Sequence, residues 1–280
     1  VTAVDYTLGR VLDWLKANDL EKNTIVIFTG DHGRGMPRFK RSPKDSGTRV
    51  PLIIRWPDQL PPGTVREDFA SWIDFAPTFL TLAGVPVPPE FDGHCFLPKA
   101  AQPPKYVYSF RDFMDESFDK VRSVRDARYR YVRNLAPGVD EAGKVAYQEI
   151  GQTMRELRRV QAEGKLTPVQ ALYFNTNRAP EELYDTQTDP WEVKNIAGDP
   201  ANAAKLAELR AECERIASRG IDLELDLEAV TYVDREGVAL LRGLPRLRAE
   251  GIPLLVGPSR KRFIGALRRS RAANISSSEK

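Results

Sequence analysis

The sequence predicts an α/β fold: a partial, mainly parallel sheet sandwiched by helices, followed by a smaller α+β subdomain with an antiparallel sheet. Helical periodicity alternates with short apolar strands before residue 104, and strands with alternating polar and apolar residues follow it. Proline-rich stretches separate the two sequence patterns. With 280 residues, of which 41% are hydrophobic, the chain is long enough for a substantial core and too apolar to be disordered.

The first part of the chain alternates helices and strands. An amphipathic helix opens it, because apolar residues from Val4 to Leu15 recur at steps of three and four. Strands are predicted at 24–29 and 50–55, and both are apolar on their two faces, which is typical of strands buried in a parallel sheet. A further helix is predicted over about 71–83.

The second part has the character of an antiparallel subdomain. Residues 106–108 and 129–132 alternate polar and apolar side chains, as strands with one solvated face do. A charged helix is predicted over about 147–162, and an amphipathic helix over about 200–218.

The pattern of apolar residues changes again after Gly220. An alternating strand near 223–227, a helix and an apolar strand at 252–256 predict a βαβ-like extension. The predicted organisation comprises residues 1–104 as an α/β domain part, 105–220 as the antiparallel subdomain, 221–267 as the extension and 268–280 as a disordered basic tail.

Composition excludes several classes of function. The net charge is only +3, from 42 basic and 39 acidic residues, so we expect no nucleic-acid partner. No apolar run is long enough to cross a membrane, so we expect no membrane partner. The two cysteines and two histidines cannot build a CxxC pair or a histidine-rich metal centre. No signal peptide opens the sequence, which leaves the compartment unknown: the protein is cytosolic, or the chain begins inside a longer one, the reading we favour.

The strongest candidate site follows the first apolar strand. Asp31 and His32, flanked by glycines, stand at its carboxyl end, where ligands bind in open α/β sheets. A carboxylate beside a second ligating group suits a hard divalent cation. Lys40 and Arg41 follow on a basic loop and could hold an oxyanion. From these few residues alone, a simple turn followed by a solvated loop is the alternative.

Five ordered motifs extend this site into a family resemblance. Residues 1 to about 218 resemble the carboxyl-terminal half of a sulfatase of the alkaline-phosphatase superfamily, most like the heparan N-sulfatase branch. The motifs are NTIVIFTGDHG at 23–33, DSGTRVPLIIRWP at 45–57, DFAPTFLTLAGV at 74–85, VRDARYRY at 124–131 and ELYDTQTDPWE at 182–192.

The resemblance implies hydrolysis of sulfate esters or N-sulfates and a sulfated small molecule or saccharide as partner. It implies a calcium ion bound by Asp31 and His32, and a sulfate bound by Lys40. It also implies that a charged loop helps to line the substrate pocket; its candidate residues are Arg111, Asp112, Asp115 and Glu116. A charged surface loop is the equally good alternative for that segment.

Two departures from the family pattern matter. Lys44 stands where the family usually has an aromatic or apolar residue, which puts the local loop packing in doubt. The nucleophile motif, Cys/Ser-x-Pro-x-Arg, does not occur in these 280 residues, and Cys95 and Cys213 do not fit it. We therefore assign no catalytic residue and expect weak calcium binding and no activity from this chain alone.

The end of the chain carries two shorter resemblances. Residues 225–241 resemble the central strand and helix of a STAS domain, and 253–265 resemble a loop of dihydropteroate synthase. Together they suggest a mosaic chain, with chance similarity as the alternative. The second reading of function is therefore a non-catalytic interaction module that binds a protein partner through 221–267. A pterin-binding fragment is a weaker third.

Overall fold

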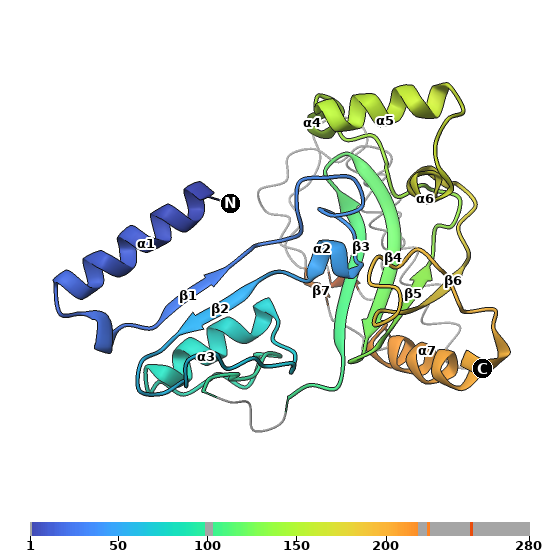
Figure 1. Ribbon diagram of the computed structural model, residues 1–280. Coiled ribbons are helices and arrows are strands. Elements are labelled where there is room, and N and C mark those ends of the chain that lie inside the picture. Colours follow the sequence, from blue (N-terminus) through green and yellow to red (C-terminus); the bar gives the residue numbers. More distant parts are fainter. Residues whose placement is uncertain (1, 99–102, 218–222, 225–246, 249–280) are drawn as a thin grey trace, which may run out of the picture. The chain divides into compact units, whose positions relative to one another are not determined.

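The computed structural model describes residues 2–98, 103–217, 223–224 and 247–248, without the side chains of 113–114 and of the residues after 217. Contacts divide the chain into two compact units, Val1–Arg215 and Ile216–Lys280. The first unit has the predicted mixed α/β architecture, with an antiparallel sheet in its second part (Figure 1). No helix among the described residues is long and apolar enough to cross a membrane.

The first part of this unit holds helices and a pair of strands. Its elements are α1 (Thr2–Ala17), η1 (Glu21–Asn23), β1 (Val26–Thr29), α2 (Asp45–Thr48), β2 (Leu52–Arg55), η2 (Trp72–Asp74) and α3 (Phe75–Leu82). The turn into α3 is fixed by Asp74, whose carboxylate accepts the backbone N–H of Ser71 at 2.7 Å. Asp74 is buried, so this hydrogen bond is shielded from water.

The pairing of β1 with β2 corrects one detail of the predicted sheet. The two strands are antiparallel, with Val26 opposite Arg55, whereas a mainly parallel sheet was expected. Parallel neighbours need a crossover that returns the chain to the starting end of the first strand. Residues 30–51 instead remain beyond the end of β1, where the N–H of Gly33 donates to the carbonyl of Gly47 at 2.8 Å.

The same two strands are less buried than predicted. All four residues of β1 are half-buried, and the side chain of Ile53 in β2 is 60% exposed. A strand that is apolar on both faces is expected to be buried on both faces. The described residues bury only part of the apolar surface of β1 and β2.

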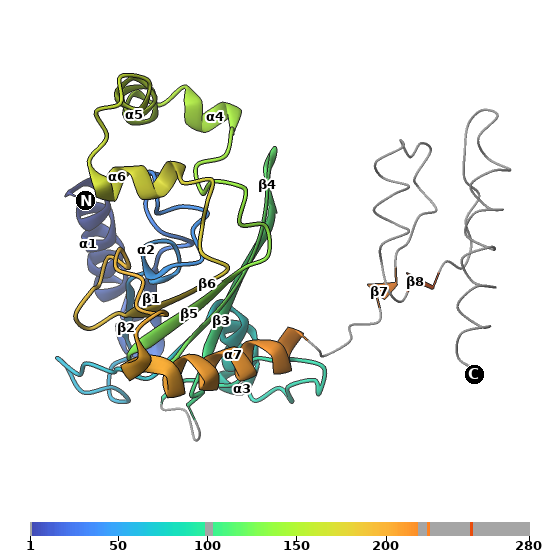
Figure 2. The same ribbon diagram turned by 90° about the vertical axis from the view of Figure 1, so that its right-hand side faces the viewer.

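The second part is built on a four-stranded antiparallel sheet, as predicted. Its order is β3 (Val107–Met114), β4 (Ser117–Arg125), β5 (Tyr129–Asn134) and β6 (Glu181–Asp185). After η4 (Pro200–Asn202), helix α7 (Ala203–Ala217) lies across this sheet (Figure 2). The core between them contains Val124, Tyr131, Leu183, Leu209 and Cys213.

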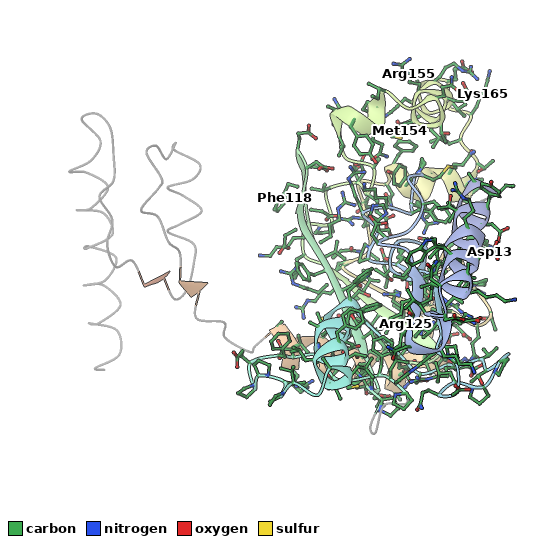
Figure 3. The ribbon with its side chains drawn as sticks, turned by 90° about the vertical axis from the view of Figure 1, so that its left-hand side faces the viewer. Asp13, Phe118, Arg125, Met154, Arg155 and Lys165 are labelled. Atoms are coloured by element: carbon green, nitrogen blue, oxygen red, sulfur yellow. The ribbon has the colours of Figure 1, made fainter. Side chains whose placement is uncertain are left out.

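A helical insertion separates β5 from β6. It comprises α4 (Ala146–Glu149), α5 (Gln152–Ala162), α6 (Pro168–Ala171) and η3 (Leu172–Phe174). The single helix predicted over 147–162 is thus divided at Gly151, which has an extended backbone and begins α5. In Figure 3, Met154 lies on the inner side of α5 and Arg155 on its outer side, and Met154 packs with Tyr173 and Phe174.

In the second unit, the described residues form two short strands. These are β7 (Leu223–Glu224) and β8 (Leu247–Arg248), which pair in parallel. The STAS-like and dihydropteroate-synthase-like stretches and the basic tail lie outside the described residues. The same holds for all but these four residues of the extension to which a protein partner was assigned.

Candidate functional site

The candidate metal ligands lie in the turn after β1. Asp31 is well exposed, with 82% of its side chain accessible, and its carboxylate accepts the backbone N–H of His32 at 3.0 Å. The imidazole Nδ1 of His32 lies 2.7 Å from the carbonyl of Gly33, and its Nε2 lies 3.3 Å from Asp31. The two predicted ligands are therefore neighbours in space as well as in sequence.

Two glycines allow the loop after β1 to fold back on itself. A Cβ atom on Gly33 would lie 2.0 Å from the carbonyl oxygen of Ser46, and one on Gly47 would lie 2.1 Å from that of Ser42. Both separations are far shorter than atoms tolerate. The backbones of the metal-ligand turn, of α2 and of the basic loop thus meet in direct contact.

Lys40 stands on that basic loop beside an aromatic ring. Its ammonium lies 5.5 Å from the ring centre of Tyr147, within the range of a cation–π contact. In the described part of the chain, the ammonium has no hydrogen bond or ion pair. A half-buried lysine without a carboxylate partner leaves its three donors for a ligand.

Arg41 joins the basic loop to two other segments. Its Nε donates to Asp115, in the turn between β3 and β4, at 2.9 Å, and its guanidinium lies 4.8 Å from the ring centre of Tyr147. A long contact of 3.5 Å connects it to Gln148. Burial opposes its charge, but the hydrogen bond with Asp115 raises the pKa of Arg41, so this cation is fixed as an anchor.

These segments enclose a small pocket of about 120 Å³. Its lining residues come from the basic loop and from the α4–α5 region: Gly35, Met36, Pro37, Lys40, Arg41, Tyr147, Gln148, Gly151, Gln152, Thr153 and Met154. Tyr147 and Gln148 were not singled out from the sequence. They lie more than 100 residues from Arg41, and no local pattern connects them to it.

A buried ionic cluster holds the basic loop and α2 against the sheet. Asp45 bonds Arg130 and, at 2.8 Å, Arg125. Burial works to raise the pKa of Asp45, but the charges of Arg130 and Arg125 lower it below its usual value. Burial raises the pKa of nearby Glu192, and Arg130, 2.6 Å away, opposes that shift.

Lys44 is the second anchor and explains the departure from the family pattern. Its ammonium bonds Glu141, and it lies 3.7 Å from Glu182 and 5.5 Å from the ring centre of Tyr184. Burial works to raise the pKa of Glu141, but the charges of Lys44 and Arg38 hold it below its usual value. Carboxylates from the sheet and the insertion thus replace the apolar contact expected at this position.

The four hairpin residues predicted to line the substrate pocket have different surroundings. Arg111 is buried and donates to the carbonyl of Glu141 at 3.0 Å, whereas Asp112 pairs with Arg122. Asp115 reaches the Lys40 pocket through Arg41. Glu116 lines a second pocket, which also contains Lys144.

Among the described residues, no group of three or more histidine, cysteine, aspartate or glutamate side chains could hold a metal ion. Asp31 offers the oxygen donor that a hard cation prefers, and His32 offers a nitrogen. The pair therefore fits one side of a metal site.

Comparison with known proteins identifies the family. Residues 1–85 match the model of the sulfatase family. An ulvan-active sulfatase of Formosa agariphila is 39% identical over 76% of this chain and 36% of its own length. Human N-sulphoglucosamine sulphohydrolase is 27% identical over 75% of this chain and 44% of its own length.

Solved structures agree with these matches. The structure of BT4656 in complex with its substrate D-glucosamine-2-N,6-O-disulfate has a TM-score of 0.56 and 25% identity, over 77% of this chain and 38% of that one. The 2-O glycosaminoglycan sulfatase BT1596 also has a TM-score of 0.56, with 28% identity, over 77% of this chain and 41% of that one.

The chain spans about a third of the length of the first two curated relatives, at 36% and 34%. The sulfatase family generally uses a metal ion. The family model matches residues 1–85, and the curated relatives and solved structures match about three quarters of the chain. The chain therefore belongs to the sulfatase family of the alkaline-phosphatase superfamily.

Proposed function

We propose that this chain supplies the sulfate-binding side of a sulfatase that hydrolyses sulfate esters or N-sulfates of a saccharide. The observation that carries the proposal is the uncompensated ammonium of Lys40, which lines a pocket in the described residues. Lys40 would donate hydrogen bonds to sulfate oxygens and disperse the charge that develops as the bond to sulfur breaks. Arg41, tied to Asp115, would keep the loop in place meanwhile.

The metal in this proposal is calcium, with Asp31 and His32 as two of its ligands. When bound, such a cation would neutralise charge on the sulfate oxygens. Asp31 is exposed to solvent, so a cation can reach its carboxylate, whereas the ring of His32 is oriented by the carbonyl of Gly33 and by Asp31. Two ligands make a weak site, because hard cations bind tightly only with more oxygen donors.

These residues do not provide the nucleophile that attacks the sulfate group. No Cys/Ser-x-Pro-x-Arg motif is present in the 280 residues, and a bound metal alone lacks a positioned nucleophile. The proposal therefore assigns binding and orientation of the sulfate to this chain and no covalent step. Turnover of an aryl sulfate above background, abolished by Asp31→Ala, would contradict that division.

The test is binding of inorganic sulfate to the full chain, followed by NMR or calorimetry. Lys40→Ala should abolish saturable binding, because it removes the one cation of the pocket that has no hydrogen bond or ion pair among the described residues. Lys22→Ala is the matched control, since Lys22 is exposed and lies outside the pocket. Equal sulfate affinity in Lys40→Ala and the original chain would refute the proposal.

A further inference from the structure

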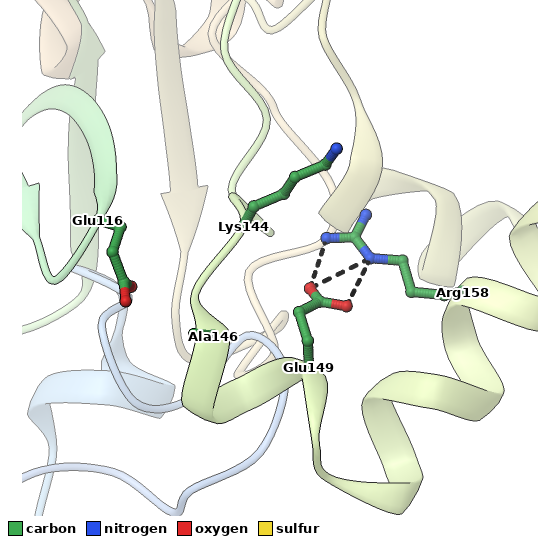
Figure 4. Close-up of a pocket in the computed structure, with 5 residues that line it drawn as sticks. All are labelled: Glu116, Lys144, Ala146, Glu149 and Arg158. Carbon is green, nitrogen blue, oxygen red and sulfur yellow. Dashed lines mark hydrogen bonds and ion pairs between the residues drawn. The ribbon is translucent and has the colours of Figure 1, made fainter.

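A second pocket lies on the other side of α4. It measures about 320 Å³ and is open to solvent. Figure 4 shows the side chains that line it: Glu116 from the β3–β4 turn, Lys144 and Ala146 at the start of α4, Glu149 at its end and Arg158 from α5. Three separate segments of the chain therefore build its wall.

Two of its charged side chains neutralise each other. Arg158 bonds Glu149 at 2.9 Å, donates to the carbonyl of Gly143 at 2.6 Å and lies 5.0 Å from the ring centre of Phe174. Its cation is thus committed to the protein.

Lys144 and Glu116, unlike Arg158 and Glu149, do not pair with each other. Neither has a hydrogen bond or an ion pair within the part of the chain that the structure describes, and in Figure 4 they stand apart across the pocket. The pocket therefore offers one uncommitted cation and one uncommitted carboxylate to a ligand. Such a pair suits a molecule that carries both an acid group and hydroxyl donors.

Helix α4 connects this pocket to that of Lys40. Ala146 and Glu149 are three residues apart, so they share a face and line the second pocket, whereas Tyr147 and Gln148 line the Lys40 pocket. The helix has four residues, which corresponds to a length of about 6 Å. Residues of this one short element therefore line both pockets.

We propose that the Lys144 pocket is a subsite for a second, anionic sugar residue of an oligosaccharide whose sulfate group is bound by Lys40. Lys144 forms an ion pair with the carboxylate or sulfate of that residue, and Glu116 accepts hydrogen bonds from its hydroxyl groups. The inference rests on the proposed function, because it takes Lys40 as the anchor of the substrate. It specifies a saccharide chain, rather than a single sulfated sugar, as the substrate class.

Three probes test this subsite by calorimetry on the full chain. They are D-glucosamine-2-N,6-O-disulfate, the same sugar extended by a hexuronate, and the same sugar extended by a neutral hexose. The hexuronate disaccharide should bind about tenfold more tightly than the monosaccharide, the gain typical of one charge-assisted hydrogen bond. A fourth probe, a disaccharide with a second sulfate in place of the carboxylate, distinguishes the two sources of negative charge.

Lys144→Ala should remove the gain and leave the affinity for the monosaccharide unchanged. Lys165→Ala is the control, since this lysine is exposed, pairs with Glu163 and lines neither pocket. Equal gains from the hexuronate and the neutral hexose would overturn the role of Lys144. The role of Lys144 would also be overturned if Lys144→Ala weakened the binding of every probe by the same factor.

The outcomes also separate this inference from the proposed function. If all probes bind equally well and Lys40→Ala weakens every one, the subsite is wrong and the sulfate pocket stands. If Lys40→Ala changes none of the affinities, or no probe binds, the proposed function fails, and the subsite fails with it.

Discussion

Arg130 of β5 and Glu192, in the segment after β6, form an ion pair of 2.6 Å, and both side chains are almost completely buried. The same guanidinium bonds Asp45 at the start of α2 and donates to the carbonyl of Pro43 at 2.7 Å. One arginine of the sheet therefore holds the segment that follows Lys40.

The first prediction concerns Asp45. Asp45→Asn should lower the free energy of unfolding at pH 7 by about 3–5 kcal/mol, because it removes the carboxylate that Arg130 and Arg125 share. Arg130 would keep Glu192 as a partner, whereas Arg125 would lose its ion pair among the described residues. Urea unfolding measures the loss. Asp13→Asn, an exposed change on α1, is the control and should have little effect.

The pH dependence of that loss has a definite sign. The pKa of Asp45 is lower in the folded than in the unfolded state, so its contribution is present above the ordinary value of 3.8. That contribution disappears as the pH falls through the lowered folded pKa. The difference in stability between the original chain and Asp45→Asn should shrink below pH 3.8, and a constant difference on acidification would refute the assignment.

The second prediction concerns Lys44. Lys44→Met should destabilise the chain, because it removes the principal partner of the buried carboxylate of Glu141. Adding Glu141→Gln removes the stranded charge, so the double variant should lose less stability than the sum of the single variants. Denaturant unfolding of the four proteins gives the coupling energy. Additive losses would mean that Lys44 acts through packing alone.

The position of the candidate metal ligands in the fold could be predicted from the sequence, because its signal is local. A short apolar strand followed by Gly-Asp-His-Gly places Asp31 and His32 at a strand end whatever the rest of the chain does. The antiparallel subdomain was predictable for the same reason, since alternation within a strand reports its one solvated face. Strand direction was not, because an apolar pattern is identical for both directions of pairing.

The contacts of the site across the fold could not be predicted. Lys44 is 97 residues from Glu141, and Arg41 is 74 residues from Asp115. The charge of these residues is visible in the sequence, but their pairing depends on how the hairpin and the helical insertion fold against the basic loop. Tyr147 carries no local sign that its ring lies beside Lys40.

The third prediction concerns the boundary that we propose after Gly220. A chain ending at residue 220 should unfold at the same temperature as the first unit of the full chain. The reason is that the described clusters of buried residues lie between Val121 and Cys213. Circular dichroism during heating measures this midpoint. A fall of many degrees would show that later residues are an integral part of the first unit, and the boundary would be wrong.

The last prediction concerns Gly47 and connects the fold to sulfate binding. A Cβ atom there would lie 2.1 Å from the carbonyl oxygen of Ser42 and 2.5 Å from that of Phe39. Both are backbone atoms of the segment that carries Lys40, so Gly47→Ala must push this segment outward. We expect a loss of about 1–3 kcal/mol in stability, the usual result of overpacking. We also expect weaker binding of inorganic sulfate, because the displaced Lys40 no longer faces Tyr147.

Gly138→Ala is the matched control for this change. A Cβ atom at Gly138 would have no neighbour within 4 Å. The same added methyl group should therefore have little effect on the free energy of unfolding and none on the affinity for sulfate. Urea unfolding and sulfate titration on both variants separate the two effects. If Gly47→Ala is destabilised yet binds sulfate as tightly as the original chain, α2 does not position Lys40, because the backbone contact with Phe39 and Ser42 is the route by which it would do so.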